Sequence, residues 1–111
     1  GNIMVYRPGD EAARVVGKGF YYDHPNVSRD GRFYVADCPE GSLIVVGSIA
    51  TGKSRVLCET GTSFGHAQYT HSHPYFTPDN KWVIFNSDRT GIPQVYAAAV
   101  PDGFLEELEK R

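Results

Sequence analysis

The sequence predicts an all-β fold, and two observations lead to this prediction. The segment "HPNVSRDGRFYVAD" (24–37) aligns with "HPYFTPDNKWVIFN" (73–86) at an offset of 49 residues. Each copy is followed by a polar loop and by a further apolar strand rich in β-branched residues. Antiparallel four-stranded units that recur at about 40–50 residues are typical of β-propeller blades, so we expect an incomplete β-propeller of about two blades.

Each copy begins as a hairpin. Asp30-Gly31 and Asp79-Asn80 are turn pairs that tolerate positive φ. The β-branched and aromatic strands 32–35 and 81–84 follow these turns. Gly47 is the one breaker inside a predicted strand, and the only helical pattern, Leu105 to Lys110, lies at the end of the chain. The other predicted strands are 2–8, 13–16, 42–49, 54–59 and 93–100.

The composition narrows the classes of function. The chain has 111 residues and a formal net charge of −2, with no basic stripe interleaved with aromatics, so we expect no nucleic-acid partner. No apolar run approaches the ~20 residues needed to cross a bilayer, so we expect no membrane partner. Two isolated cysteines form neither a disulfide framework nor a C-x-x-C site, and a cytoplasmic setting is expected.

The repeat divides the chain into three parts: 1–18 as the end of a blade, 19–66 as a full blade, and 67–111 as the last blade with a C-terminal tail. Closed propellers have about 4–8 blades, so two would leave apolar faces and sheet edges exposed. We therefore expect remaining blades or self-association to cover them. The chain also lacks an initiator Met, which suggests upstream sequence.

The segment "GSIATGKS" (47–54) satisfies the phosphate-binding pattern G-x-x-x-x-G-K-[ST]. That motif works at the start of a helix, where backbone N–H groups meet the phosphates. Here "RVLCETG" follows, which leaves no room for a helix. We therefore interpret the segment as a turn between two strands and predict no nucleotide site.

Gln68, His71 and His73 form a Q-x-x-H-x-H pattern in a chain with four histidines. On a β-strand His71 and His73 would point to the same face, where two imidazoles can share a cation. His24 occupies the position equivalent to His73 in the neighbouring blade. The sequence thus offers four candidate metal ligands: His24, Gln68, His71 and His73.

Two other interpretations bear on the same residues. A His-Pro pair that opens a strand can be architectural only, with the imidazole capping the loop. A cupin barrel is suggested by "GHAQYTHSH" (65–73), but cupins need a Glu four or five residues later, where this chain has Thr77 and Pro78. His66 falls outside the repeat, in a Gly-rich loop, and is not predicted as a ligand.

The segment "HPYFTPDNKWVIFNSDRTGIPQVYAA" (73–98) resembles the propeller repeat of TolB-like proteins. The added "Q-x-x-H-x-H-P" (68–74) resembles oligogalacturonate lyases, seven-bladed propeller enzymes of pectin breakdown. The resemblance covers essentially the whole chain, as the C-terminal portion of the family's chain. It implies an oligogalacturonide substrate and a divalent metal, manganese, bound by Gln68, His71, His73 and, through its place in the repeat, His24.

The resemblance also implies a reaction. The family cleaves its substrate by β-elimination, in which a base takes the proton α to the uronate carboxylate and the metal stabilises the developing charge. The family's catalytic His and substrate-binding Arg come from earlier blades and have no place here, so the catalytic residues are unknown. We expect no lyase activity from this chain alone. A non-catalytic TolB-like module for protein or peptide binding is the alternative function.

Overall fold

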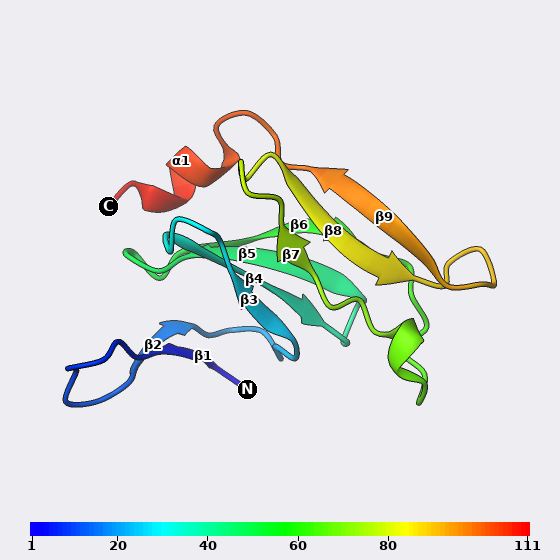
Figure 1. Cartoon of the computed structure of the whole chain (residues 1–111), viewed down its shortest axis with the longest axis horizontal. Helices are drawn as coiled ribbons and strands as arrows, with labels where there is room; N and C mark the ends of the chain where they lie inside the picture. Colours follow the sequence, from blue (N-terminus) through cyan, green and yellow to red (C-terminus); the bar gives the residue numbers. More distant parts are fainter.

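A computed structural model describes all residues, 1–111, and has three antiparallel sheets (Figure 1). The first pairs β1 (Ile3–Val5) with β2 (Arg14–Gly17). The second has the order β3 (Pro25–Val27), β4 (Phe33–Cys38), β5 (Leu43–Ser48) and β6 (Ser54–Glu59). The third has the order β7 (Tyr75–Phe76), β8 (Trp82–Ser87) and β9 (Gln94–Ala99). A short 3-10 helix, η1 (Gln68–Thr70), precedes β7, and α1 (Phe104–Glu109) ends the fold.

The second sheet lies between the other two (Figure 1), and its central strands β4 and β5 are buried on both faces. All six residues of β4 are buried, and alternate side chains pack in opposite directions. Phe33 and Val35 join one core with the third sheet and α1, while Tyr34 and Ala36 join another core with the first sheet. Strands buried on both faces explain why the sequence shows apolar runs here instead of apolar–polar alternation.

The predicted repeat is confirmed at the level of single hydrogen bonds. In the first hairpin the Ser28 hydroxyl donates to Asp30 Oδ1 at 2.6 Å, and Gly31 has φ 74°. In the second, the Thr77 hydroxyl donates to Asp79 Oδ1 at 2.7 Å, and Asn80 has φ 60°. The same side-chain turn therefore starts the strand pair in both copies.

Gly47 lies inside β5 because an aromatic ring occupies the space of a side chain. It pairs with Tyr34 of β4, and a Cβ at position 47 would lie 2.1 Å from the Tyr34 ring. Gly17, at the end of β2, faces the same ring, and a Cβ at position 17 would lie 2.6 Å from the Tyr34 hydroxyl oxygen. The strand breaker noted in the sequence is thus the partner of a large core residue.

The segment 47–54 forms the turn between β5 and β6, as predicted, and no helix follows it. Its polar residues cap α1: the Thr51 hydroxyl donates to the Leu108 carbonyl at 2.6 Å, and the Lys53 ammonium donates to the Lys110 carbonyl. Phe104 and Leu108 of α1 are buried in the core shared with the third sheet. The lysine that would bind phosphate in the nucleotide motif therefore caps the C-terminal end of α1.

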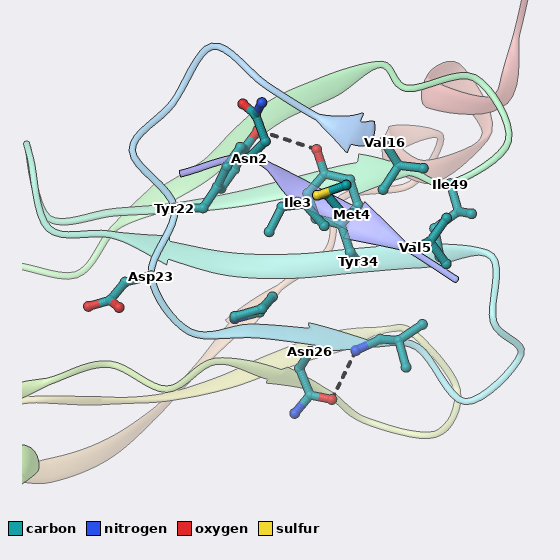
Figure 2. A pocket seen from close by; sticks show the side chains of 12 residues that line it. Asn2, Ile3, Met4, Val5, Val16, Tyr22, Asp23, Asn26, Tyr34 and Ile49 are labelled. Atoms are coloured by element: carbon teal, nitrogen blue, oxygen red, sulfur yellow. Dashed lines mark hydrogen bonds between the residues drawn. The ribbon is translucent and has the colours of Figure 1, made fainter. Parts of the chain in front are cut away.

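The strands β1 and β9 are edge strands of the first and third sheets, and each has a neighbour on one side only. An apolar cleft of about 370 Å³ lies between β1 and β3, with the paired hydroxyls of Tyr22 and Tyr34 beside it (Figure 2). Met4 on its rim is 58% exposed.

Neither Cys38 nor Cys58 forms a disulfide. The structure contains no helix with the length and apolar character that a membrane crossing requires.

Candidate metal centre

Three histidines meet where the chain enters the second and third sheets. His24 immediately precedes β3, and His71 and His73 lie in the segment between η1 and β7. The rings of His24 and His73 are 3.8 Å apart between centroids, and those of His24 and His71 are 5.5 Å apart. One ring nitrogen from each of the three lies within 4.8 Å of the others. All three side chains are half-buried, so a small ligand could reach them.

The prediction that His71 and His73 lie on a β-strand is wrong. The strand β7 begins only at Tyr75, and His73 has a left-handed backbone with φ 43°. Only Tyr75 and Phe76 pair with β8, while upstream the Ser72 carbonyl accepts a hydrogen bond from the Asn86 N–H. The histidines therefore meet through a turn that stays alongside β8, and strand alternation does not bring them together.

His71 has one ring nitrogen without a partner. Its Nε2 lies 2.8 Å from the Gly65 carbonyl, which can only accept a hydrogen bond, so Nε2 carries the hydrogen. Its Nδ1 is then a free lone pair, and this buried atom has no hydrogen-bond partner in the chain. A buried imidazole nitrogen of this kind fits a metal ligand, because an unpaired buried acceptor is otherwise costly.

Gln68 completes the group. Its Oε1 accepts a hydrogen bond from Nε2 of His73 at 3.2 Å, and a bound cation would take the place of that hydrogen. Neighbouring ligands on one ion, each ~2.1 Å from it, lie about 3 Å apart, so this spacing suits a shared cation. Burial, followed by the neighbouring His24, lowers the pKa of His73, which favours the neutral imidazole that binds metals. The donor set of three imidazoles and one amide oxygen therefore fits a divalent transition metal.

The loop that carries Gln68 and His71 is held by hydroxyl and carboxylate contacts. The Ser63 N–H and hydroxyl donate to Asp88 at 2.8 and 2.6 Å, and the Thr62 hydroxyl contacts both Asp88 and the Thr70 carbonyl. The ring of Phe64 stacks on His71 at 5.6 Å between centroids. These contacts define where η1 and its glutamine lie.

The sequence analysis did not identify two acidic residues of this region. Asp37 is fully buried and contacts His24, and the exposed Asp23 lies 3.6 Å from the same ring nitrogen, so Asp23, His24 and Asp37 form a second cluster of polar groups. Neither acid is assigned as a metal ligand. A signal was present: an acid ends the apolar strand "FYVAD" where the second copy has Asn86. His66 is exposed and lies outside both groups.

The chain is similar to known proteins over most of its length. The sequence profile of the oligogalacturonate lyase family matches residues 5–104. An oligogalacturonide lyase of Pectobacterium atrosepticum is 41% identical over 81 residues, which is 69% of this chain and 20% of the relative. An oligogalacturonate lyase of Dickeya dadantii is 38% identical over the same shares. The chain thus spans about a fifth of the length of these curated relatives.

Solved structures of oligogalacturonate lyases are also similar to this chain. An oligogalacturonate lyase in complex with manganese superposes with a TM-score of 0.74 at 26% identity, over 84% of this chain and 27% of that one. The oligogalacturonate lyase of Vibrio parahaemolyticus gives 0.75 at 25% identity, over 91% and 32%. TolB from Acinetobacter baumannii, at 0.65 and 23% identity over 83% and 22%, shares the β-propeller fold. With a family profile that matches nearly the whole chain and a propeller fold, this chain belongs to the oligogalacturonate lyase family.

Proposed function

We propose that this chain is the metal-binding C-terminal part of an oligogalacturonate lyase-like enzyme that cleaves oligogalacturonides by β-elimination. The observation that carries the proposal is the meeting of His24, His71 and His73, with an unpaired buried nitrogen on His71. Gln68 adds an amide oxygen beside His73. Manganese is the proposed ion, since a similar lyase was solved in complex with it.

Held by these residues, a divalent cation would supply Lewis-acid stabilisation of negative charge on a substrate carboxylate. The four proposed ligands are all neutral, so they leave the ion its full charge for that carboxylate. The His24 and His73 rings lie 3.8 Å apart between centroids, close enough for both imidazoles to bind one ion. The proton at the carbon next to the carboxylate must go to a base, and no residue of this chain is assigned that role.

We further propose the division into blades at 1–18, 19–66 and 67–111. The three sheets support it, because each begins and ends within one of these ranges. In this arrangement the metal ligands come from the start of the full blade and from the segment that opens the last blade. The site therefore depends on the packing of two blades against each other.

Metal binding by the purified chain tests the proposal. Titration calorimetry with Mn²⁺ is expected to show one site per chain. Replacing both ligands, His71→Ala with His73→Ala, should abolish it, and His71→Ala alone should weaken binding at least about tenfold. The matched control is His66→Ala, which removes an exposed imidazole five positions away and should leave the affinity unchanged.

Two outcomes would refute the proposed metal site: no Mn²⁺ bound by the wild-type chain, or an ion that stays bound in the double variant. The first would favour a non-catalytic propeller module instead. The substrate needs its own assay, in which the full-length gene product with Mn²⁺ should release unsaturated uronate from oligogalacturonate. The 111-residue chain alone should release none, and full-length protein without product would refute the substrate even with metal bound.

A further inference from the structure

Asp37 is a fully buried acid at the end of a row of apolar core side chains. It is 0% exposed and lies in β4, where it continues the row of Phe33 and Val35 that faces the third sheet. Burying an isolated carboxylate is costly, so its contacts must compensate for lost hydration. The row of apolar side chains ends in this carboxylate at the point where His24 and His73 come together.

The carboxylate of Asp37 receives hydrogen bonds from both histidines. The backbone N–H of His24 donates to Oδ1 at 2.7 Å, and Nδ1 of His24 lies 3.1 and 3.0 Å from the two oxygens. The backbone N–H of His73 donates to Oδ2 at 3.2 Å. Asp37 therefore links the strand opener of one sheet to that of the next.

The repeat shows that the fold itself does not require an acid here. In the second copy the equivalent position is Asn86, also near the end of a central strand. An uncharged amide thus suits the same place in a blade. The charge at position 37 calls for another explanation, and its contacts lie on two of the three clustered histidines.

We propose that Asp37 is a positioning residue of the metal centre, a role that rests on the proposed metal binding. A carboxylate can only accept hydrogen bonds, so it holds the hydrogen of His24 on Nδ1 and leaves Nε2 with the free lone pair. Through Oδ2 it also holds the left-handed turn at His73, whose φ of 43° is unfavourable for a residue with a side chain. Carboxylates behind metal-binding histidines set the ring orientation and the tautomer.

The variant Asp37→Asn tests this role. The amide can donate to Nδ1 of His24, which moves the ring hydrogen to Nε2 and removes the free lone pair there. We expect Mn²⁺ affinity to fall about 10- to 100-fold. The control is Asp23→Asn, which removes the same charge from an exposed side chain 3.6 Å from the same nitrogen. It should change the affinity by no more than about twofold, since Asp23 makes no hydrogen bond to the ring.

A double variant tests whether Asp37 affects metal binding through the ring of His24. In a His24→Ala background, Asp37→Asn should weaken Mn²⁺ binding much less than in the wild type, because the ring that it orients is gone. Three results would each overturn the proposal. The first is that Asp37→Asn lowers Mn²⁺ affinity equally in the wild-type and His24→Ala backgrounds, and the second is that Asp23→Asn lowers it as much as Asp37→Asn does. The third is an Asp37→Asn chain that folds and binds Mn²⁺ as tightly as the wild type.

A spectroscopic readout needs neither a folded variant nor metal. Imidazole ¹⁵N spectra of the wild-type apo chain at about pH 8, where histidines are mostly neutral, should show His24 as the Nδ1–H tautomer. The Nε2–H tautomer would overturn the proposal even if Asp37→Asn failed to fold. If the wild-type chain shows the expected tautomer but binds no Mn²⁺, the proposed metal function fails while the positioning contact stands.

Discussion

At the scale of single residues, Tyr34 determines which residues its neighbours can be. Its ring lies over Gly47 on the adjacent strand and reaches Gly17 of the first sheet. A glycine in a strand normally weakens it, because there is no side chain to pack. Here the tyrosine fills that space, and its hydroxyl meets the hydroxyl of Tyr22 at 3.3 Å. The aromatic residue and its glycines therefore act as one packing unit.

The variant Gly47→Ala tests this unit. The added Cβ would lie 2.1 Å from the Tyr34 ring, so the ring or the strand must shift. We expect the free energy of unfolding in urea to fall by about 1–3 kcal/mol, the usual cost of overpacking. In a Tyr34→Ala background the same substitution should cost much less. Equal costs in both backgrounds would show that the ring is not the obstacle.

The proposed ligand residues illustrate what a pattern can and cannot predict at this scale. Gln68, His71 and His73 were predicted from their spacing, and His24 from its place in the repeat. The structure brings the three histidines together, but through a turn at His73 instead of a strand. The buried Asp37 was missed because an acid at a strand end is expected to be exposed when the packing of the next blade is unknown.

At the scale of elements, Asp88 holds the loop 60–71 that carries Gln68 and His71. It follows β8 and receives hydrogen bonds from the Ser63 hydroxyl, the Ser63 N–H and the Thr62 hydroxyl. The Ser63 hydrogen bonds are the main cause that holds the pKa of Asp88 below its ordinary value of 3.8. The third sheet thereby anchors a loop that leaves the second sheet.

This anchor predicts a pH dependence of stability. A carboxyl whose pKa is lower in the folded state stabilises the fold above pH 3.8, and the contribution is lost as the pH falls through the lowered pKa. The thermal midpoint of the wild type should therefore drop on acidification below pH 3.8. Asp88→Asn should lower the midpoint at pH 7 and show a smaller drop in acid.

The control for this prediction is Asp102→Asn, which changes an exposed acid in the turn before α1. It should leave both the midpoint at neutral pH and the acid drop nearly as in the wild type. If Asp88→Asn were as stable at pH 7 as this control, the loop would not depend on the Asp88 contacts.

At the scale of the whole molecule, the fold leaves surfaces that a closed propeller would cover. The strands β1 and β9 have unpaired edges, and an apolar cleft opens between β1 and β3 (Figure 2). Val95 on β9 is 70% exposed, and Val27 on β3 is 54% exposed. Open edges beside exposed apolar side chains favour pairing with another chain or with further blades.

We therefore expect the purified chain to self-associate at micromolar concentrations. Light scattering coupled to size exclusion should give a mass above the 12.3 kDa of one chain. Met4→Lys, at the rim of the cleft, should shift the distribution toward the monomer, because the cleft would then have to bury a charge. Thr90→Lys adds the same charge at an exposed turn and should not. A wild-type chain that stays monomeric throughout would contradict the expectation.

The sequence by itself determined the all-β class, the repeat with its two turns, the short C-terminal helix, and the residues of the proposed ligand set. These follow from local chemistry, since turn pairs, strand composition and side-chain type are properties of short segments. Only the tertiary structure decided how His24 meets His71 and His73, which nitrogen of His71 is free, and why Asp37 and Gly47 lie where they do. Those features depend on contacts between strands and between sheets, where residues distant in the chain share one small volume, and no local pattern encodes that proximity.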